Sequence, residues 1–271
     1  MTFAQRLAAA IAVPLVLLAP VQASAGVGDL LVAPPRIVLN GSRGAEIVLS
    51  NIGVEVATYR ISVELRRMKE DGSLEDVPTA NEREKTAQDM IVYAPRRVTI
   101  APNEPQTIRI AARAPQGLPD GEYRAHLLFR AVPPPRPVTA PKEVKGIAFE
   151  LIPIYGVTIP VVIRMGNLQA KVGIANVQLT KHDGKPAVAL DLTRAGGRSV
   201  FGDVRVFKAG IKDPIAVQRG VAVYTEIGTR HVVIPVNPDL AGAASGPVTV
   251  DFVETSEAGP VSMAETKSVL R

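Results

Sequence analysis

Neither cysteine nor tryptophan occurs among the 271 residues of the chain. Without cysteine there are no disulfide bonds, so stability must come from the burial of apolar side chains. Aromatic residues make up only 4% of the sequence. This scarcity disfavours a carbohydrate-binding module, because such modules stack sugars on aromatic rings.

Long runs of like charge are also missing. The formal net charge of +5 is small and dispersed, and the charged clusters are short and of mixed sign, as in Glu82-Arg83-Glu84-Lys85. Such clusters are typical of a solvated surface. The charge pattern therefore predicts no nucleic-acid binding.

Motifs for catalysis or for binding a cofactor or metal do not occur either. The three histidines, His126, His182 and His231, are scattered; His182 suits a surface turn and the other two suit structural positions in strands. Metalloprotease, phosphate-loop, nucleophile-elbow and EF-hand patterns are absent. We expect no enzyme, no cofactor and no metal, which leaves binding as the function class.

The first 25 residues have the pattern of a cleavable export signal. Arg6 is positive, residues 7–18 are apolar, and Ala23-Ser24-Ala25 offers a cleavage site. The apolar run is shorter than the roughly 20 residues that span a bilayer. We therefore expect an exported chain that begins near Gly26 and has no membrane anchor.

The rest of the sequence alternates between short β-type runs and turn residues. Gly, Pro, Asn and Asp separate runs rich in Val, Ile, Thr, Leu and Tyr. We predict strands at residues 29–33, 36–40, 45–51, 57–68, 90–94, 97–100, 106–113, 122–132 and 147–163, and then at 169–180, 186–194, 201–207, 214–218, 220–225, 230–235, 247–253 and 261–269. Residues 80–89 suit a helix or a loop equally.

Many short strands without alternating helices predict an all-β protein with two β-sandwich domains in tandem. Turn residues at Met165-Gly166-Asn167 place the boundary there, which gives domains at 26–164 and 165–271. Residues 132–141 contain five prolines and suit a stiff exposed loop or an interdomain linker. We favour the loop, because the segment after it still has the pattern of the first domain.

Residues 147–163 have the pattern of one strand, about three times the usual length. Every odd position is apolar, and these positions lie on one face of a strand. Pro153 and Pro160 have no amide hydrogen, which favours an edge strand over a central one. An apolar edge favours aggregation unless a partner covers it, so we predict that this edge serves a partner.

Several segments resemble the periplasmic chaperones of pilus assembly, the chaperone–usher family. They are Pro35-Arg36-Ile37-Val38-Leu39-Asn40-Gly41, Ile47-Val48-Leu49-Ser50-Asn51, Tyr93-Ala94-Pro95-Arg96-Arg97, the run from Ile100 to Arg109, Gly121-Glu122-Tyr123-Arg124, and the run from Leu127 to Pro134. Their order over residues 29–164 carries the resemblance, whereas the second half agrees only in length and β character.

The resemblance implies two immunoglobulin-like domains arranged as a boomerang with a cleft between them. Such chaperones act in the periplasm, donate an alternating apolar strand to pilus or fimbrial subunits, and deliver them to an outer-membrane usher. Strand addition at an exposed sheet edge is a known mode of recognition. The subunit and the usher are therefore the expected partners, and an uncovered edge would also favour a self-capping dimer.

The resemblance also implies roles for individual residues. Arg36 matches the family arginine that holds the C-terminal carboxylate of the subunit, a task that suits a planar guanidinium. The long strand supplies the subunit-binding row Ile147, Phe149, Leu151, Pro153 and Tyr155. The first three follow the proline-rich segment and are the favoured donors, whereas Tyr155 fits packing in its own domain equally well.

Two features depart from the family pattern. The long strand has no lysine at Gly156, Thr158 or Pro160, where most members pair one with the arginine, so a second cation would have to come from Arg164 or a neighbouring strand. Gly121-Glu122-Tyr123-Arg124 replaces a common Arg-Glu-Ser segment. The alternative to a chaperone is a structural or adhesin-like secreted protein whose long strand is buried in its own sheet.

Overall fold

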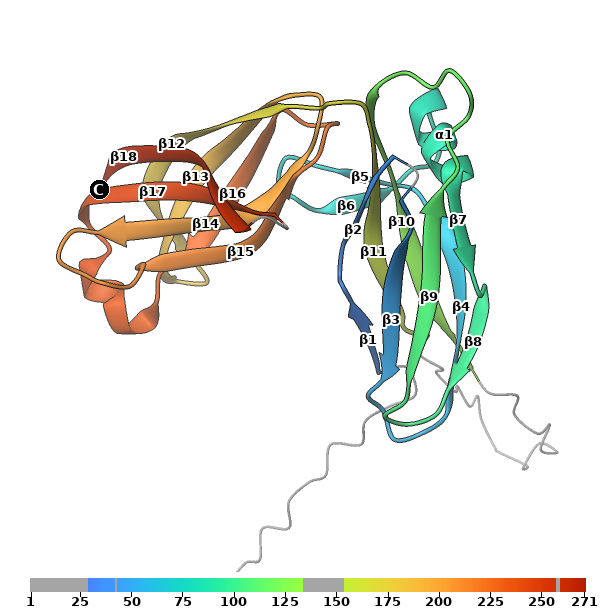
Figure 1. The fold of residues 1–271 in the computed structure, drawn as a ribbon. Coiled ribbons are helices and arrows are strands. Elements are labelled where there is room, and N and C mark those ends of the chain that lie inside the picture. Colours follow the sequence, from blue (N-terminus) through green and yellow to red (C-terminus); the bar gives the residue numbers. More distant parts are fainter. Residues whose placement is uncertain (1–28, 42, 134–153, 257–258) are drawn as a thin grey trace, which may run out of the picture.

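The computed structural model describes residues 29–41, 43–133, 154–256 and 259–271. They form two β-domains set at an angle to each other, like the arms of a boomerang (Figure 1). The predicted all-β class with two β-sandwiches is confirmed. No helix in the described ranges is both long and apolar enough to cross a membrane.

The first domain packs one sheet of order β1-β3-β9-β7, here sheet A, against a second of order β2-β11-β10-β4-β8, here sheet B. Its elements are β1 (Leu30–Ala33), β2 (Ile37–Asn40), β3 (Ala45–Asn51), β4 (Ala57–Glu64), β5 (Arg66–Met68), β6 (Leu74–Asp76), α1 (Glu82–Met90), β7 (Ile91–Ala94), β8 (Arg97–Ile100), β9 (Pro105–Ala112), β10 (Gly121–Val132) and β11 (Gly156–Met165). The core between the sheets includes Leu39, Ile47, Tyr59, Leu127 and Phe129.

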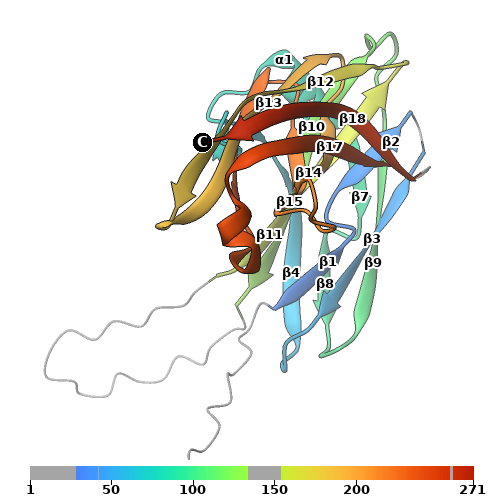
Figure 2. The same cartoon turned by 90° about the vertical axis from the view of Figure 1, so that its left-hand side faces the viewer.

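The second domain packs a sheet of order β12-β13-β16 against one of order β15-β14-β17-β18. Its elements are β12 (Ala170–His182), β13 (Lys185–Gly196), β14 (Val200–Lys208), β15 (Ala216–Val223), β16 (Thr229–Pro235), the 3-10 helix η1 (Pro238–Ala243), β17 (Gly246–Ser256) and β18 (Gly259–Leu270). A separate apolar cluster with Leu192, Val206 and Phe252 fills this domain. When the molecule is turned by 90° about the vertical axis of Figure 1, the strands of the second domain lie in front of the first domain (Figure 2).

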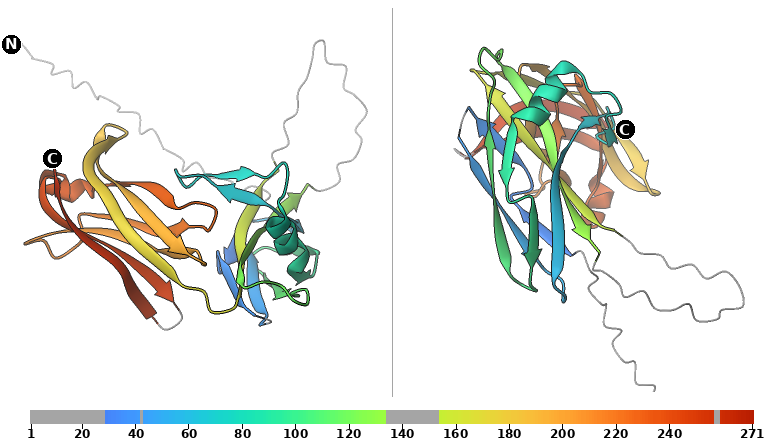
Figure 3. Two further views of the ribbon diagram at one scale, coloured as in Figure 1. Left: turned by 90° about the horizontal axis from the view of Figure 1, so that it is seen from above. Right: turned by 90° about the vertical axis from the view of Figure 1, so that its right-hand side faces the viewer.

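A hairpin of β5 and β6 extends from the first domain and contacts the second (Figure 3). Met68 of β5 is buried against Ala222 and Tyr224, and its backbone N–H donates to Glu226 Oε1 at 2.9 Å. Gly72 turns the hairpin with φ +84°, and a Cβ there would meet the Arg230 guanidinium at 2.4 Å. The hairpin thus ties the two domains together.

Of the predicted strand at 147–163, residues 156–163 are confirmed, residues 154–155 are not in a strand, and residues 147–153 lie outside the described residues. Within the described residues β11 begins at Gly156, opposite Arg130 near the end of β10, and it runs on to Met165. Ile154 and Tyr155 precede the strand, although the Ala131 N–H still donates to the Tyr155 carbonyl at 2.9 Å. On the β10 side the strand ends at Val132, and Pro133 has no N–H to donate.

Three other predicted strands also differ from the structure. Residues 57–68 form β4 and β5 rather than one strand, since the chain leaves sheet B after Glu64 to build the hairpin. Residues 214–218 and 220–225 are largely one strand, β15, because Gly220 takes φ +68° at a bulge opposite β14 without ending it. A glycine can adopt this conformation without strain, so it marks a bulge here instead of a turn.

Candidate functional site: a cleft between the two domains

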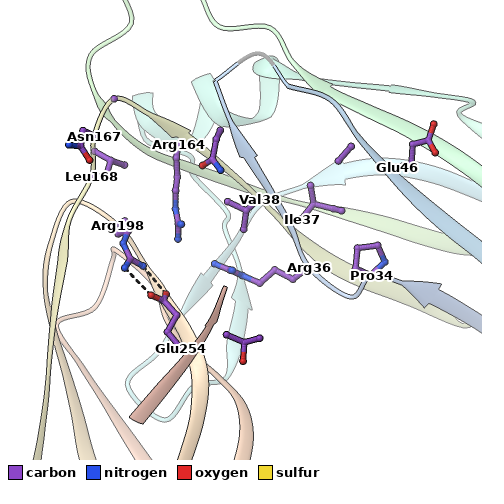
Figure 4. Close-up of a pocket in the computed structure, with 14 residues that line it drawn as sticks. Pro34, Arg36, Ile37, Val38, Glu46, Arg164, Asn167, Leu168, Arg198 and Glu254 are labelled. Carbon is purple, nitrogen blue, oxygen red and sulfur yellow. Dashed lines mark hydrogen bonds and ion pairs between the residues drawn. The ribbon is translucent and has the colours of Figure 1, made fainter. Parts of the chain in front are cut away.

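A cleft of about 740 Å³ lies between the domains, with residues of both in its walls. Strands β1 and β2 belong to different sheets, so the chain crosses from sheet A to sheet B at residues 34–36. This crossing places Arg36 just before β2, and its side chain extends into the cleft, as Figure 4 shows. Arg164 at the end of β11 and Arg198 before β14 line the same space.

Arg36 has few partners for a partly buried cation. Its Nη2 donates to Ser199 Oγ at 3.3 Å, and its guanidinium carbon lies 4.9 Å from the centroid of the Phe201 ring. Its buried Nε has no hydrogen-bond partner among the described residues, and no described carboxylate forms a salt bridge with it. Burial lowers the pKa of Arg36, and the nearby Arg164 adds to this effect.

Arg164 is held by a buried carboxylate. Its Nε donates to Glu122 Oε2 at 3.0 Å, and its Nη2 donates to the Ser199 carbonyl at 3.1 Å. The same Glu122 oxygen accepts the Ser199 N–H at 3.0 Å. Glu122 of the first domain therefore links Arg164 to the backbone of the second domain. Sequence reasoning did not assign Glu122 a role.

Arg198 forms a bidentate pair with Glu254 of β17, with N–O distances of 2.7 and 2.9 Å. Both side chains are mostly buried, at 16% and 14% exposed. This pair engages both terminal nitrogens of the Arg198 guanidinium. Of the three cleft arginines, Arg36 alone has a buried donor without a partner and no salt bridge within the described residues.

The three positions at which most of the family has a lysine do not line the cleft. Gly156, Thr158 and Pro160 are not among the residues that line it, whereas Arg164 is. A guanidinium with an unpaired donor in a partly desolvated cleft is suited to binding a carboxylate, because charge-assisted hydrogen bonds strengthen as water is excluded. The cleft can therefore take an anionic group.

One edge of β11 is open next to the cleft. Strand β2 pairs with β11 only from Val161 to Arg164, and no described strand pairs with that side of residues 156–160. The odd side chains of β11, Ile159, Val161 and Ile163, are buried in the core of their own domain. An added strand would therefore pair with the backbone of β11 while leaving this core intact.

Of the predicted subunit-binding row, the structure places only Tyr155. Its side chain is exposed, at 56%, so packing in its own core does not account for it. Ile154 beside it is also exposed, at 47%. Ile147, Phe149, Leu151 and Pro153 lie outside the described residues.

The pKa values of His126 and His231 are shifted in opposite directions. His126 is 1% exposed, and burial together with Arg124 and Arg66 lowers its pKa to about 3. His231 lies at the hairpin, where Asp191 raises its pKa and Glu70 adds to the effect. The described residues contain no cluster of His, Asp or Glu suited to a metal ion.

No protein-family model matches the sequence, and no curated protein sequence matches it. Among solved structures the chain is similar to the YadV chaperone, with 16% identity, a TM-score of 0.47, and coverage of 89% of this chain and 100% of that one. It is similar to the class 5 fimbriae chaperone CfaA, with 12% identity, a TM-score of 0.47, and coverage of 89% and 99%. It is also similar to a chain in the CsuC–CsuE chaperone–subunit complex of Acinetobacter baumannii Csu pili, with 14% identity, a TM-score of 0.45, and coverage of 89% and 97%.

Proposed function

We propose that this chain is a periplasmic chaperone of the chaperone–usher type, which binds pilus or fimbrial subunits and delivers them to an outer-membrane usher. The observation that carries the proposal is an arginine, Arg36, with an unpartnered donor in an interdomain cleft beside the open edge of β11. The sequence segments that resemble this family contribute both Arg36 and the strands around it.

In this function Arg36 anchors the C-terminal carboxylate of the subunit. Its pairing with Ser199 Oγ and its position over Phe201 orient the guanidinium without neutralising it. A terminal carboxylate would supply the counter-charge and accept hydrogen bonds from two guanidinium nitrogens. The subunit chain would then leave the cleft alongside β11.

The subunit adds its strand to the open edge of β11. Backbone hydrogen bonds supply affinity, and alternate side chains supply specificity. The alternation that buries Ile159, Val161 and Ile163 in the chaperone core continues in the sequence to Ile147, Phe149 and Leu151. Burial of each such side chain in a subunit contributes about 1.5–3 kcal/mol before ordering costs are subtracted.

Arg164 takes the place of the missing lysine only as a source of positive potential. Glu122 and the Ser199 carbonyl occupy its Nε and Nη2, so it lies in the cleft wall as a partly neutralised cation. Arg36 then provides the direct contact to the carboxylate. The uncovered β11 edge also supports a self-capping dimer in the absence of a subunit.

Co-expression in the periplasm with a candidate fimbrial subunit tests this function. We expect the Phe149→Asp and Leu151→Asp double variant to melt like the wild type and to lose the subunit on size-exclusion chromatography. The control is Val92→Asp, which changes an exposed apolar residue of β7 that is 43% exposed, and it should keep the subunit.

The outcomes separate the chaperone from the adhesin-like alternative. If the double variant unfolds, as judged by circular dichroism and thermal melting, the strand is part of its own core and the alternative is favoured. If it folds and still co-purifies with the subunit, strand donation by these residues is wrong.

A further inference from the structure

Three arginines form a continuous row across the outer face of sheet B. Arg130 of β10 lies directly opposite Arg60 of β4, and Arg60 lies directly opposite Arg97 of β8. Directly opposed residues in antiparallel strands have Cβ atoms about 5 Å apart on the same face of the sheet. The three side chains are all exposed. We call these residues the arginine row.

The arginine row has no acidic counterpart on the described surface. None of its members forms a salt bridge with a described residue, whereas the exposed Arg109 on the other sheet, sheet A, pairs with Glu46 at 3.4 Å. Like charges placed directly opposite one another destabilise a sheet. A row of three therefore costs stability unless a partner supplies the opposite charge.

The position of the arginine row indicates which partner would reach it. Arg124 and His126 lie on the same face of β10 as Arg130, and Arg124 forms an ion pair with Glu226 of the second domain. The second domain thus covers one end of this face, and the row lies further along it. Arg130 is also opposite Gly156, the first residue of β11. A protein bound between the domains and along β11 would lie next to the row.

Features around the row favour a folded protein surface over a membrane. Small hydroxyl residues flank the arginines, with Thr58 and Thr99 hydrogen-bonded to each other at 2.8 Å, and they leave a flat sheet that a second surface can approach closely. Glu55 and Glu104 are exposed at the end of the domain beyond the row. They would repel a continuous layer of anionic lipid headgroups, whereas a discrete acidic patch on a protein can pair with the row without reaching them.

We infer that the arginine row is a docking surface for an acidic patch on a protein partner, which in the proposed function is the subunit. Arginine suits this role because its guanidinium binds carboxylates in a bidentate manner, and complementary charge speeds association and fixes orientation. The inference rests on the proposed function only for the identity of the partner. The substitution that tests it, at Arg60, changes neither Arg36 nor the donor strand.

The test is the charge reversal Arg60→Glu at the centre of the row, with poly-L-glutamate as the probe at low salt. Glutamate between Arg130 and Arg97 would convert two repulsions into two attractions, so we expect the melting temperature to rise by about 1–4 °C. Affinity for poly-L-glutamate should fall by about fivefold or more. A variant that merely disturbs the fold would lower the melting temperature instead.

The matched control is Arg109→Glu, which changes the net charge equally and places a second glutamate beside Glu46. It should lower the melting temperature and weaken binding of the probe by about twofold or less. Equal loss of binding in both variants would overturn the inference, because net charge alone would then explain it. Stronger binding of the wild type to anionic phosphatidylglycerol vesicles than to poly-L-glutamate would also overturn it.

The Arg36→Ala variant distinguishes the proposed anchor in the cleft from the proposed docking surface at the arginine row. It should bind poly-L-glutamate with wild-type affinity, since Arg36 lies in the cleft and not on the arginine row. If it loses the probe as Arg60→Glu does, the cleft and not the row binds the probe, and the inference is wrong. If subunit capture fails in the strand variants while the row still binds the probe, only the chaperone function is contradicted.

Discussion

The guanidinium of Arg36 lies over the ring of Phe201, 4.9 Å from its centroid. An arginine of the first domain is therefore positioned by an aromatic residue of the second. Ser199, which accepts its hydrogen bond, belongs to the second domain as well. The orientation of Arg36 thus depends on the angle between the domains, and so does the anion site that we propose.

Replacing Phe201 tests this dependence. Phe201→Leu removes the cation–π contact and keeps an apolar side chain, so carboxylate affinity should fall by about two- to fivefold. The matched control is Phe207→Leu, which removes a similar contact with Arg205 at 5.2 Å, away from the cleft. Isothermal titration with a peptide carboxylate measures both. Equal losses in the two variants would contradict a specific role for Phe201.

Removing the charge of Glu254 should strengthen anion binding. Glu254→Gln weakens the bidentate pair with Arg198 and leaves that cation in the cleft wall. We expect affinity for a peptide carboxylate to rise by about threefold or more, and the gain should shrink in high salt because of screening. Unchanged affinity would show that Arg198 does not contribute to the potential at Arg36.

Glu226 should be the most sensitive residue of the hairpin interface. It forms an ion pair with Arg124, whose side chain is 8% exposed, and accepts the Met68 N–H at 2.9 Å. Glu226→Gln leaves Arg124 buried without its counter-charge, which should lower the free energy of unfolding by about 2–3 kcal/mol. Glu46→Gln, in the exposed pair with Arg109, should cost less than about 1 kcal/mol. Urea denaturation compares the two.

The buried His126 predicts an acid-sensitive fold. Burial, Arg124 and Arg66 lower its pKa to about 3, while a histidine in the unfolded chain titrates near 6.5. Between about pH 3 and 6.5 the unfolded state therefore binds a proton that the folded state does not. Stability should rise with pH across this window, by at most about 1.4 kcal/mol per unit from this residue.

His231 has the opposite effect on how stability depends on pH. Asp191 raises its pKa, so its contribution is complete below about pH 6.5 and is lost as pH rises through the higher folded value. His126→Gln should flatten the acid slope in urea titrations between pH 4 and 7. His182→Gln, at the exposed end of β12, should leave the slope unchanged. A wild-type slope in His126→Gln would contradict this assignment.

Strands whose ends are set by local turn chemistry were predictable from the sequence. The predicted ranges 45–51 and 97–100 match β3 and β8. Gly44 and Asn51 bound the first, and Pro95 and Pro102 lie within two residues of the ends of the second. Residues 80–89 suited a helix or a loop equally, and the structure has the helix α1 there. The sequence signal for this helix is also local. Asn81 and Glu84 form a reciprocal capping box that fixes the first turn.

Long-range pairing explains what the sequence did not reveal. The alternation of β10 puts Glu122 and Arg124 on the face opposite the core, but nothing in the sequence shows that the second domain covers that face. The hairpin after Glu64 likewise depends on docking against Tyr224, more than 140 residues away. Arg36 was identified by resemblance, and its lack of a carboxylate partner appeared only in the fold.

A double-mutant cycle on Arg36 and a terminal carboxylate tests the central claim most directly. A peptide from the C-terminus of a co-purified subunit is titrated calorimetrically, with a free carboxylate or an amide, into the wild type and Arg36→Ala. The wild type should bind the carboxylate about tenfold or more tightly than the amide, and Arg36→Ala should bind both equally. If Arg36→Ala still prefers the carboxylate as strongly as the wild type does, Arg36 is not the anchor.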